Sequence, residues 1–137
     1  MRDYERLDRR EMDLSNQKLR GNFSLNYKII VQPTFEREAK RLNKRYASFK
    51  KDFTKLLDAL EADPHLGIDL GSNLRKIRMR ITSKGKGKSG GARVITFTVV
   101  VSLDEAEINL IYIYDKAERE SIKADELAEL LRKNGLI

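Results

Sequence analysis

The chain has 137 residues, of which 40% are hydrophobic and 36% are charged, and its formal net charge is +7 at pH 7. These values are typical of one globular domain with a modest core and exclude a disordered chain. The sequence contains no Cys and no apolar run of the ~20 residues that cross a bilayer, and we expect no secretory signal and no membrane partner. We therefore predict a cytoplasmic protein, and its basic balance favours nucleic acid or an acidic protein as partner.

Residues 1–25 form a charged segment in which basic and acidic side chains nearly balance. Tyr4, Leu7 and Leu14 fit one helical stripe, although Glu11 interrupts it. We predict a charged helical extension over residues 1–25 and a folded domain over residues 26–137.

The folded domain is expected to begin with a short strand over Tyr27–Gln32, followed by two helices. Apolar residues recur at helical spacing over residues 35–46 and again over residues 49–60. Thr34 and Ser48 are candidate N-caps for these two helices. Because only a couple of residues separate the two stripes, we predict an antiparallel helical hairpin. An irregular segment is expected to lead from it to residue 73.

Residues 74–101 carry the strongest functional signal in the chain. The first part alternates, with Ile77 and Met79 on one face and basic residues on the other, which is the period of a half-buried strand. A loop rich in Gly and Lys over residues 83–91 joins it to a second β-rich run, so we predict a β-hairpin. The basic residues as far as position 93 are Arg75, Lys76, Arg78, Arg80, Lys84, Lys86, Lys88 and Arg93, without any Asp or Glu among them. Since like charges on one sheet face repel, we interpret this face as a surface for a polyanion, with a solvated face as the alternative.

The C-terminal part is predicted to hold a last strand over residues 108–114 and a closing helix over residues 123–134. Strict alternation in that strand would put Tyr112 and Tyr114 on one face together with Leu110. The resulting order is β-α-α-β-β-β-α, which predicts an α+β domain with a small sheet of antiparallel type. The acidic residues are scattered without metal-ligand spacing, so no metal and no cofactor is expected.

Three stretches of this order are specific in combination, although each would be weak alone. They are RKIRMR over residues 75–80, GKSGGARVI over residues 87–95 and LIYIYDKAERE over residues 110–120. Together they resemble the RelE/ParE superfamily of bacterial type II toxins, and in particular its HigB-like branch. The resemblance covers roughly residues 27–135.

The resemblance implies a sheet that carries the helical hairpin on one face and RNA on its other, concave face. It implies the toxin of a type II toxin–antitoxin system, acting as a metal-independent, ribosome-dependent mRNA endoribonuclease (an mRNA interferase) in the ribosomal A site. In this reaction the 2′-hydroxyl of the RNA attacks the neighbouring phosphate. The implied partners are a cognate antitoxin protein and mRNA on the ribosome, and no cofactor is implied.

Residue by residue, the resemblance implies catalytic roles for Arg93, Arg78, Lys76 and Lys116. Arg93 matches the arginine that opens the third strand and contacts the scissile phosphate, Lys76 and Arg78 match outward positions of the second strand, and Lys116 matches the lysine ending the fourth. Guanidinium groups suit this work because they bind phosphate through two parallel hydrogen bonds. The remaining residues expected to bind RNA are Arg80, Lys84, Lys86, Lys88, Tyr112, Tyr114 and Arg119. The two tyrosines can stack on a base or relay a proton.

The chain departs from the RelE pattern at two positions. An arginine follows the lysine of the fourth strand in that branch, but here Ala117 stands there, so that Lys116 or Arg119 has to substitute. A catalytic tyrosine begins the last element in that branch, whereas this chain has Ile122 and Lys123. The identity of the general acid and base is therefore not carried over.

Two other functions remain open from the sequence. The first is a ParE-like toxin that inhibits DNA gyrase, although sheets of that type usually lack so dense a basic row. The second is a catalytically inert homologue that only binds RNA or its antitoxin, and the two departures from the family pattern keep this alternative open. Inhibition of DNA supercoiling would identify the former, and salt-dependent RNA binding without cleavage the latter.

Overall fold

The computed structural model of the protein describes residues 25–85 and 90–137. Residues 1–24, which hold nearly all of the predicted helical extension, and Lys86 and Lys88 lie outside these ranges. The elements are β1 (Asn26–Val31), α3 (Pro33–Arg45), α4 (Phe49–Ala62), β2 (Ile68–Gly71), β3 (Leu74–Met79), the short 3₁₀ helix η1 (Thr82–Lys84), β4 (Ala92–Ser102), β5 (Glu105–Asp115) and α5 (Ala124–Lys133). The predicted α+β class is confirmed.

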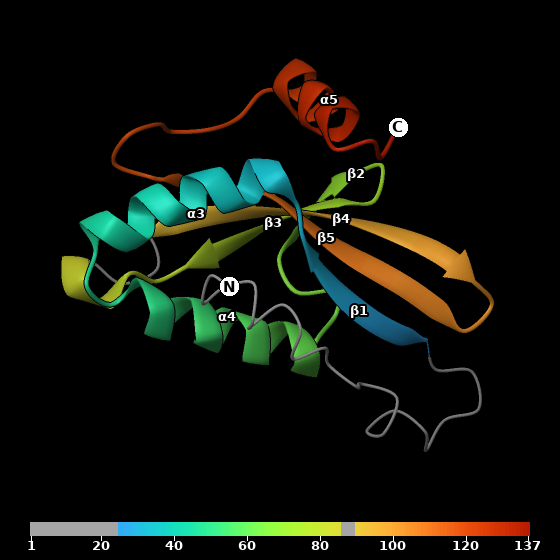
Figure 1. The fold of residues 1–137 in the computed structure, drawn as a ribbon, viewed down its shortest axis with the longest axis horizontal. Coiled ribbons are helices and arrows are strands. Elements are labelled where there is room, and N and C mark those ends of the chain that lie inside the picture. The colour runs from blue at the N-terminus through green and yellow to red at the C-terminus, as the bar shows by residue number, and fades with distance from the viewer. Residues whose placement is uncertain (1–24, 86–89) are drawn as a thin grey trace.

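The strands form one five-stranded sheet with the order β1-β5-β4-β3-β2 (Figure 1). The predicted basic hairpin is present as the antiparallel pair β3–β4. β1 pairs in parallel with β5, so the sheet is mixed and not wholly antiparallel. The segment expected to be irregular before residue 74 contains β2, which pairs with β3. Its four residues are all exposed, and so short a run carries no burial pattern that a sequence could reveal.

The helical hairpin of α3 and α4 covers one face of the sheet. Phe35 and Phe53 are fully buried there, with ring centroids 5.6 Å apart, and they pack with Ile77, Met79 and Ile113 of the sheet. The predicted apolar face of β3 is therefore confirmed as core. Burial of each such side chain contributes about 1.5–3 kcal/mol, which is the main force that fixes the hairpin on the sheet.

The closing helix α5 packs on the opposite face, so that α4 and α5 lie on opposite sides of the sheet in Figure 1. Leu127 and Leu131 of α5 contact Leu74, Ile95 and Ile111 of the sheet. The helix therefore covers part of the face on which we expected RNA. Basic residues at the end of β3 stay outside this cover and are exposed.

A bulge in β5 changes which side chains share a face. The register of β4 and β5 shifts so that Ile111 is an extra residue between Leu110 and Tyr112. Leu110 packs in the core under α3 and α4, whereas Tyr112 and Tyr114 contact the cluster under α5. Our prediction that both tyrosines share a face with Leu110 is wrong, because a bulge breaks the two-residue period of a strand. It brings the tyrosines to the face of the basic residues.

Gly91 has a packing role within the GKSGGARVI stretch. A Cβ added there would lie 2.1 Å from the carbonyl oxygen of Met79 and 3.0 Å from the backbone nitrogen of Ile81. The carbonyl of Gly91 also accepts a hydrogen bond from the Lys116 N–H at 3.0 Å. Gly91 therefore lets the start of β4 approach the end of β3 and the end of β5.

We expect Gly91→Ala to lower the free energy of unfolding by about 1–3 kcal/mol, because two backbone segments have to separate. Urea unfolding measures this as a lower midpoint. Gly71→Ala is the matched control, since its Cβ would meet nothing within 4 Å and only its φ of +87° is unfavourable. A loss no larger at Gly91 than at Gly71 would contradict the packing role.

Candidate nucleic-acid interface

Three adjacent strands bring the predicted catalytic residues Arg78 and Arg93 beside Tyr114, which was predicted to bind RNA. Arg78 of β3 pairs with Arg93 of β4, and Arg93 pairs in turn with Tyr114 of β5. Neighbouring strands lie about 4.8 Å apart, so these side chains form a ladder across the sheet. Lys76 and Tyr112 stand one pleat further along on the same face, on either side of Ile95. Residues that are distant in sequence therefore form one surface, which we call the cationic ladder.

Arg93 is the buried cation of this ladder, with 6% of its surface exposed. Its Nη1 donates a hydrogen bond to the carbonyl of Ala92 at 3.2 Å. Burial lowers the pKa of Arg93, the charge of Arg78 lowers it further, and Tyr114 acts in the opposite direction. The group still remains charged at neutral pH, because an arginine in a protein is not deprotonated there. Two adjacent cations, one of them buried, create a site that an anion would stabilise.

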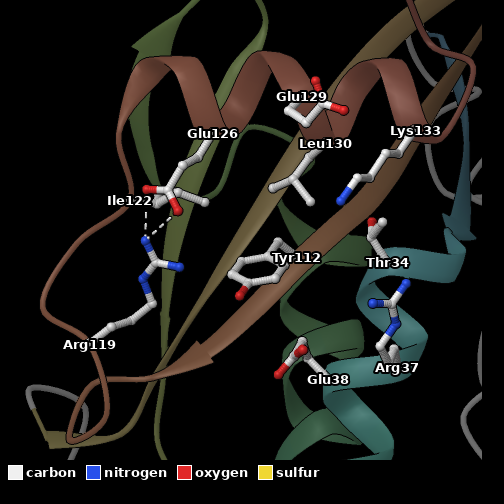
Figure 2. Close-up of a pocket in the computed structure, with 10 residues that line it drawn as sticks. All are labelled: Thr34, Arg37, Glu38, Tyr112, Arg119, Ile122, Glu126, Glu129, Leu130 and Lys133. Carbon is white, nitrogen blue, oxygen red and sulfur yellow. Dashed lines mark hydrogen bonds and ion pairs between the residues drawn. The ribbon is translucent and has the colours of Figure 1, made fainter.

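The two tyrosines and Arg119 form a stack at the other end of the ladder. The ring centroids of Tyr112 and Tyr114 are 6.2 Å apart, and the guanidinium carbon of Arg119 lies 6.0 Å and 5.6 Å from them. Arg119 Nη2 donates to both carboxylate oxygens of Glu126 at 2.8 Å, and Nε donates to the carbonyl of Ser121 at 3.0 Å (Figure 2). The hydrogen bonds to Glu126 raise the pKa of Arg119. Together with the bond to Ser121 they hold its guanidinium over the rings.

The hydroxyl of Tyr114 is buried and has no hydrogen-bond partner among the described residues. Burial raises the pKa of Tyr114, while the charges of Arg93 and Arg119 act in the opposite direction. The phenol is therefore neutral at pH 7 and carries a proton that it can donate. A buried polar group without a partner costs about 1–3 kcal/mol, which is a reason to look for a ligand that would bind it.

Lys84 lies away from the cationic ladder, in a buried ion pair. Its Nζ is 2.6 Å from Oδ1 of Asp115, and the two side chains are 9% and 0% exposed. The hydroxyl of Tyr46 donates to Oδ2 of Asp115 at 2.5 Å, and the N–H of Ala117 donates to Oδ1 at 2.9 Å. This arrangement joins η1, the end of α3 and the end of β5. The ammonium group of Lys84 is therefore buried and paired with Asp115, and it does not point into solvent.

The other basic residues predicted from the sequence have different surroundings. Lys116 follows β5 directly, and its Nζ donates to the carbonyl of Glu120 at 2.8 Å. Arg80 is exposed just beyond β3 and has no hydrogen-bond or ion-pair partner within the described ranges. Lys86 and Lys88 lie outside the described residues.

Two hollows border this surface, and the sequence predicted neither. One of about 260 Å³ lies between α3, β5 and α5, where Tyr112 and Arg119 meet Arg37 and Lys133 (Figure 2). The other, of about 680 Å³, lies between α4 and the part of β3 that holds the basic row. Arg37 and Lys133 are exposed basic residues on separate helices, and no spacing in the sequence relates them.

Neither a metal site nor a membrane span was found in the part of the chain that the structure describes. Within residues 25–85 and 90–137, no group of three or more His, Cys, Asp or Glu side chains is arranged to hold a metal ion. No helix in these ranges has the length and apolar character needed to cross a membrane.

Residues 27–135 match the family model described as the RelE toxin of the RelE/RelB toxin–antitoxin system. The chain therefore belongs to the RelE toxin family, and its five-stranded mixed sheet with helices on both faces is consistent with a fold of this kind. The match confirms the resemblance at the level of the RelE/ParE superfamily. Membership implies a toxin with a partner antitoxin. A comparison with curated proteins gave no match.

The ion pair of Asp115 predicts a pH-dependent stability. Burial raises the pKa of Asp115, but the hydrogen bonds from Lys84, Tyr46 and Ala117 outweigh it, so that the pKa lies below its usual value of 3.8. A depressed pKa in the folded state means that Asp115 stabilises the fold above about pH 4 and loses this effect as the pH falls further.

We expect Asp115→Asn to lower the free energy of unfolding at pH 7 by about 3–5 kcal/mol, because the Lys84 ammonium loses its partner. The difference from the wild type should shrink between pH 4 and pH 2, which urea unfolding at several pH values measures. Asp104→Asn, at an exposed position, is the control and should follow the wild type. Parallel pH profiles for Asp115→Asn and the wild type would rule out this role.

Proposed function

We propose that this protein is a metal-independent mRNA endoribonuclease of the HigB-like branch that cuts transcripts on the ribosome in the cytoplasm. Its antitoxin would hold it inactive. The observation that carries the proposal is the cross-strand register of Arg78, Arg93 and Tyr114, which joins two cations and a proton-bearing phenol on one face. The dependence on the ribosome is drawn from the family.

The reaction needs charge stabilisation more than it needs a cofactor. The 2′-hydroxyl oxygen forms a bond to the neighbouring phosphorus while the bond to the 5′-oxygen breaks. One proton passes from the 2′-hydroxyl to a general base, and another passes from a general acid to the departing 5′-oxygen. Negative charge gathers on the phosphoryl oxygens as this happens, and preorganised cations stabilise it strongly. We assign this work to Arg93 and Arg78, whose guanidinium groups can each donate two hydrogen bonds to phosphate.

The cross-strand register also suggests a residue for proton transfer. Tyr114 is protonated at neutral pH and lies opposite Arg93 in register, so we assign its hydroxyl to hydrogen bonding or proton donation at the departing oxygen. Lys76 lies on the same face, one pleat from Arg78, and we assign it to the adjoining RNA backbone. Lys116 follows β5 just beyond Tyr114 and stays a candidate for the same phosphate.

The first test is primer extension on translating ribosomes and, separately, on free RNA. We expect codon-phased cuts by the wild type on ribosomes and at least a ~100-fold loss of cutting with Arg93→Ala, the usual size for a transition-state donor. Arg93→Lys should restore only part of the activity, since an ammonium cannot bind phosphate in a bidentate way. Lys51→Ala, at an exposed position of α4, is the control and should cut normally.

Absence of cuts by folded wild-type protein on both substrates would refute the proposal. Inhibition of DNA supercoiling by purified gyrase in the same situation would identify a ParE-like toxin. RNA binding without cutting or gyrase inhibition would identify an inert homologue.

Tyr114→Phe separates function from packing at this site. Removal of an unpartnered buried hydroxyl should leave the stability unchanged or raise it by about 1 kcal/mol. Cutting on ribosomes should nevertheless fall about 10²-fold, the lower range for a positioned proton donor. Urea unfolding and primer extension on the same preparation measure both effects. Normal cutting by Tyr114→Phe would exclude the hydroxyl from the reaction.

A further inference from the structure

The pocket between α3, β5 and α5 lies beside the cationic ladder, and the proposed cleavage reaction gives it no role. It has a volume of about 260 Å³, and Arg119 and Tyr112 are among the residues that line it (Figure 2). The guanidinium carbon of Arg119 lies 5.6 Å from the ring centroid of Tyr114. Tyr112 lies two residues from Tyr114 along β5, which corresponds to about 7 Å. A strand of RNA that crosses Arg93 and Tyr114 would therefore meet this pocket within about one nucleotide.

The acidic residues of the pocket are already neutralised by arginines. Each of its three glutamates forms an ion pair with an arginine: Glu126 with Arg119 at 2.8 Å, Glu38 with Arg41 at 3.1 Å, and Glu129 with Arg132 at 3.4 Å. Arg41 is shared, because it also pairs with Glu118 at 2.7 Å. The pocket is therefore less acidic than its composition indicates, and its glutamates are not free to repel an anion at full strength.

Two basic residues of the pocket are able to bind an anion. Within residues 25–85 and 90–137, Arg37 of α3 and Lys133 of α5 have neither an ion-pair nor a hydrogen-bond partner. Figure 2 shows both side chains at the end of the pocket where Thr34 lies. Thr34 braces that end, because its hydroxyl donates to the carbonyl of Ile111 at 2.5 Å and accepts from the Asn134 amide at 2.7 Å. The first turn of α3 adds the positive end of its helix dipole.

The centre of the pocket is aromatic and apolar. The Tyr112 ring lies there half-buried, below Leu130 of α5, and Ile122 completes the apolar lining (Figure 2). Arg119 is fixed by Glu126, so this wall is preorganised and not a mobile surface side chain. A planar ring with a cation at one end and an apolar wall at the other fits a nucleobase.

We propose that this pocket is a nucleotide subsite that holds the residue of the RNA strand next to the cleaved one. The phosphate binds between Arg37 and Lys133, and the base stacks against Tyr112. This inference rests on the proposed function, because it takes the RNA on the cationic ladder as the strand that continues into the pocket. Stacking accepts every base, so the subsite would extend the footprint and not select one base.

The test is equilibrium binding of a short single-stranded 2′-O-methyl oligonucleotide to the full chain, measured by fluorescence anisotropy over a range of salt. The oligonucleotide lacks the attacking hydroxyl, so no cleavage interferes. We expect Arg37→Gln with Lys133→Gln to weaken binding about tenfold and to make the slope of log K against log salt shallower by about 0.7, the value for one phosphate on a single strand.

Lys40→Gln with Lys44→Gln is the matched control, since it removes two charges from exposed positions on α3 outside the pocket. It should leave the slope unchanged. Tyr112→Ala should weaken binding about tenfold without a change of slope, because stacking releases no counterions, and Tyr112→Phe should bind normally. Competition with AMP and with inorganic phosphate separates a nucleotide from a simple anion, and AMP should displace the oligonucleotide at the lower concentration.

Equal losses in the two double variants, or displacement by phosphate at the same concentration as AMP, would overturn the subsite. These readouts involve neither ribosomes nor cleavage. A failure of the wild type to cut transcripts would therefore refute the endoribonuclease without changing the binding result, and a failed subsite would leave the endoribonuclease standing.

Discussion

The register between β4 and β5 is the constraint on which both the packing and the proposed site depend. β5 is buried on both faces, with Leu110 under the helical hairpin and Ile111 under α5. The bulge at Ile111 lets two successive residues serve opposite faces and then moves Tyr112 and Tyr114 to the side of Arg93. A one-residue slip would reverse every later side chain, so burial of the core and alignment of the ladder are selected together.

A second constraint fixes the two ends of the loop between β3 and β4. At one end, the Lys84–Asp115 ion pair ties η1 to the end of β5. At the other, Gly91 lies so close to the Met79 carbonyl that no side chain fits between them. Arg93 stands two residues after Gly91, so this close approach also sets where its guanidinium begins. Gly91 of the GKSGGARVI stretch is therefore required at least in part by packing.

The sequence predicted the elements whose burial is periodic and missed those that depend on tertiary context. Helices α3, α4 and α5 and the β3–β4 hairpin were predicted because one apolar face repeats at a fixed spacing. The four exposed residues of β2 have no such pattern, and the bulge at Ile111 shows only in the pairing of β5 with its neighbour. In the candidate site, the alternation of apolar and basic residues predicted which face of β3 carries the basic side chains. The hollow between Arg37 and Lys133 could not, because it exists only where α5 folds back beside α3.

The distribution of carboxylates decides which cations keep an unbalanced positive charge, and a count of basic residues in the sequence overestimates them. Lys84 is neutralised by Asp115, and Arg119 by Glu126, so both hold the fold together before any ligand arrives. Arg78 has no acidic partner among the described residues and is exposed beside buried Arg93. Either Lys116 or Arg119 was expected to substitute for the arginine that the family has at position 117, and the charge of Arg119 is already offset by Glu126. In the proposed site the stabilisation of a phosphate is therefore assigned mainly to Arg78 and Arg93, while Arg119, paired with Glu126, lies over the two tyrosine rings.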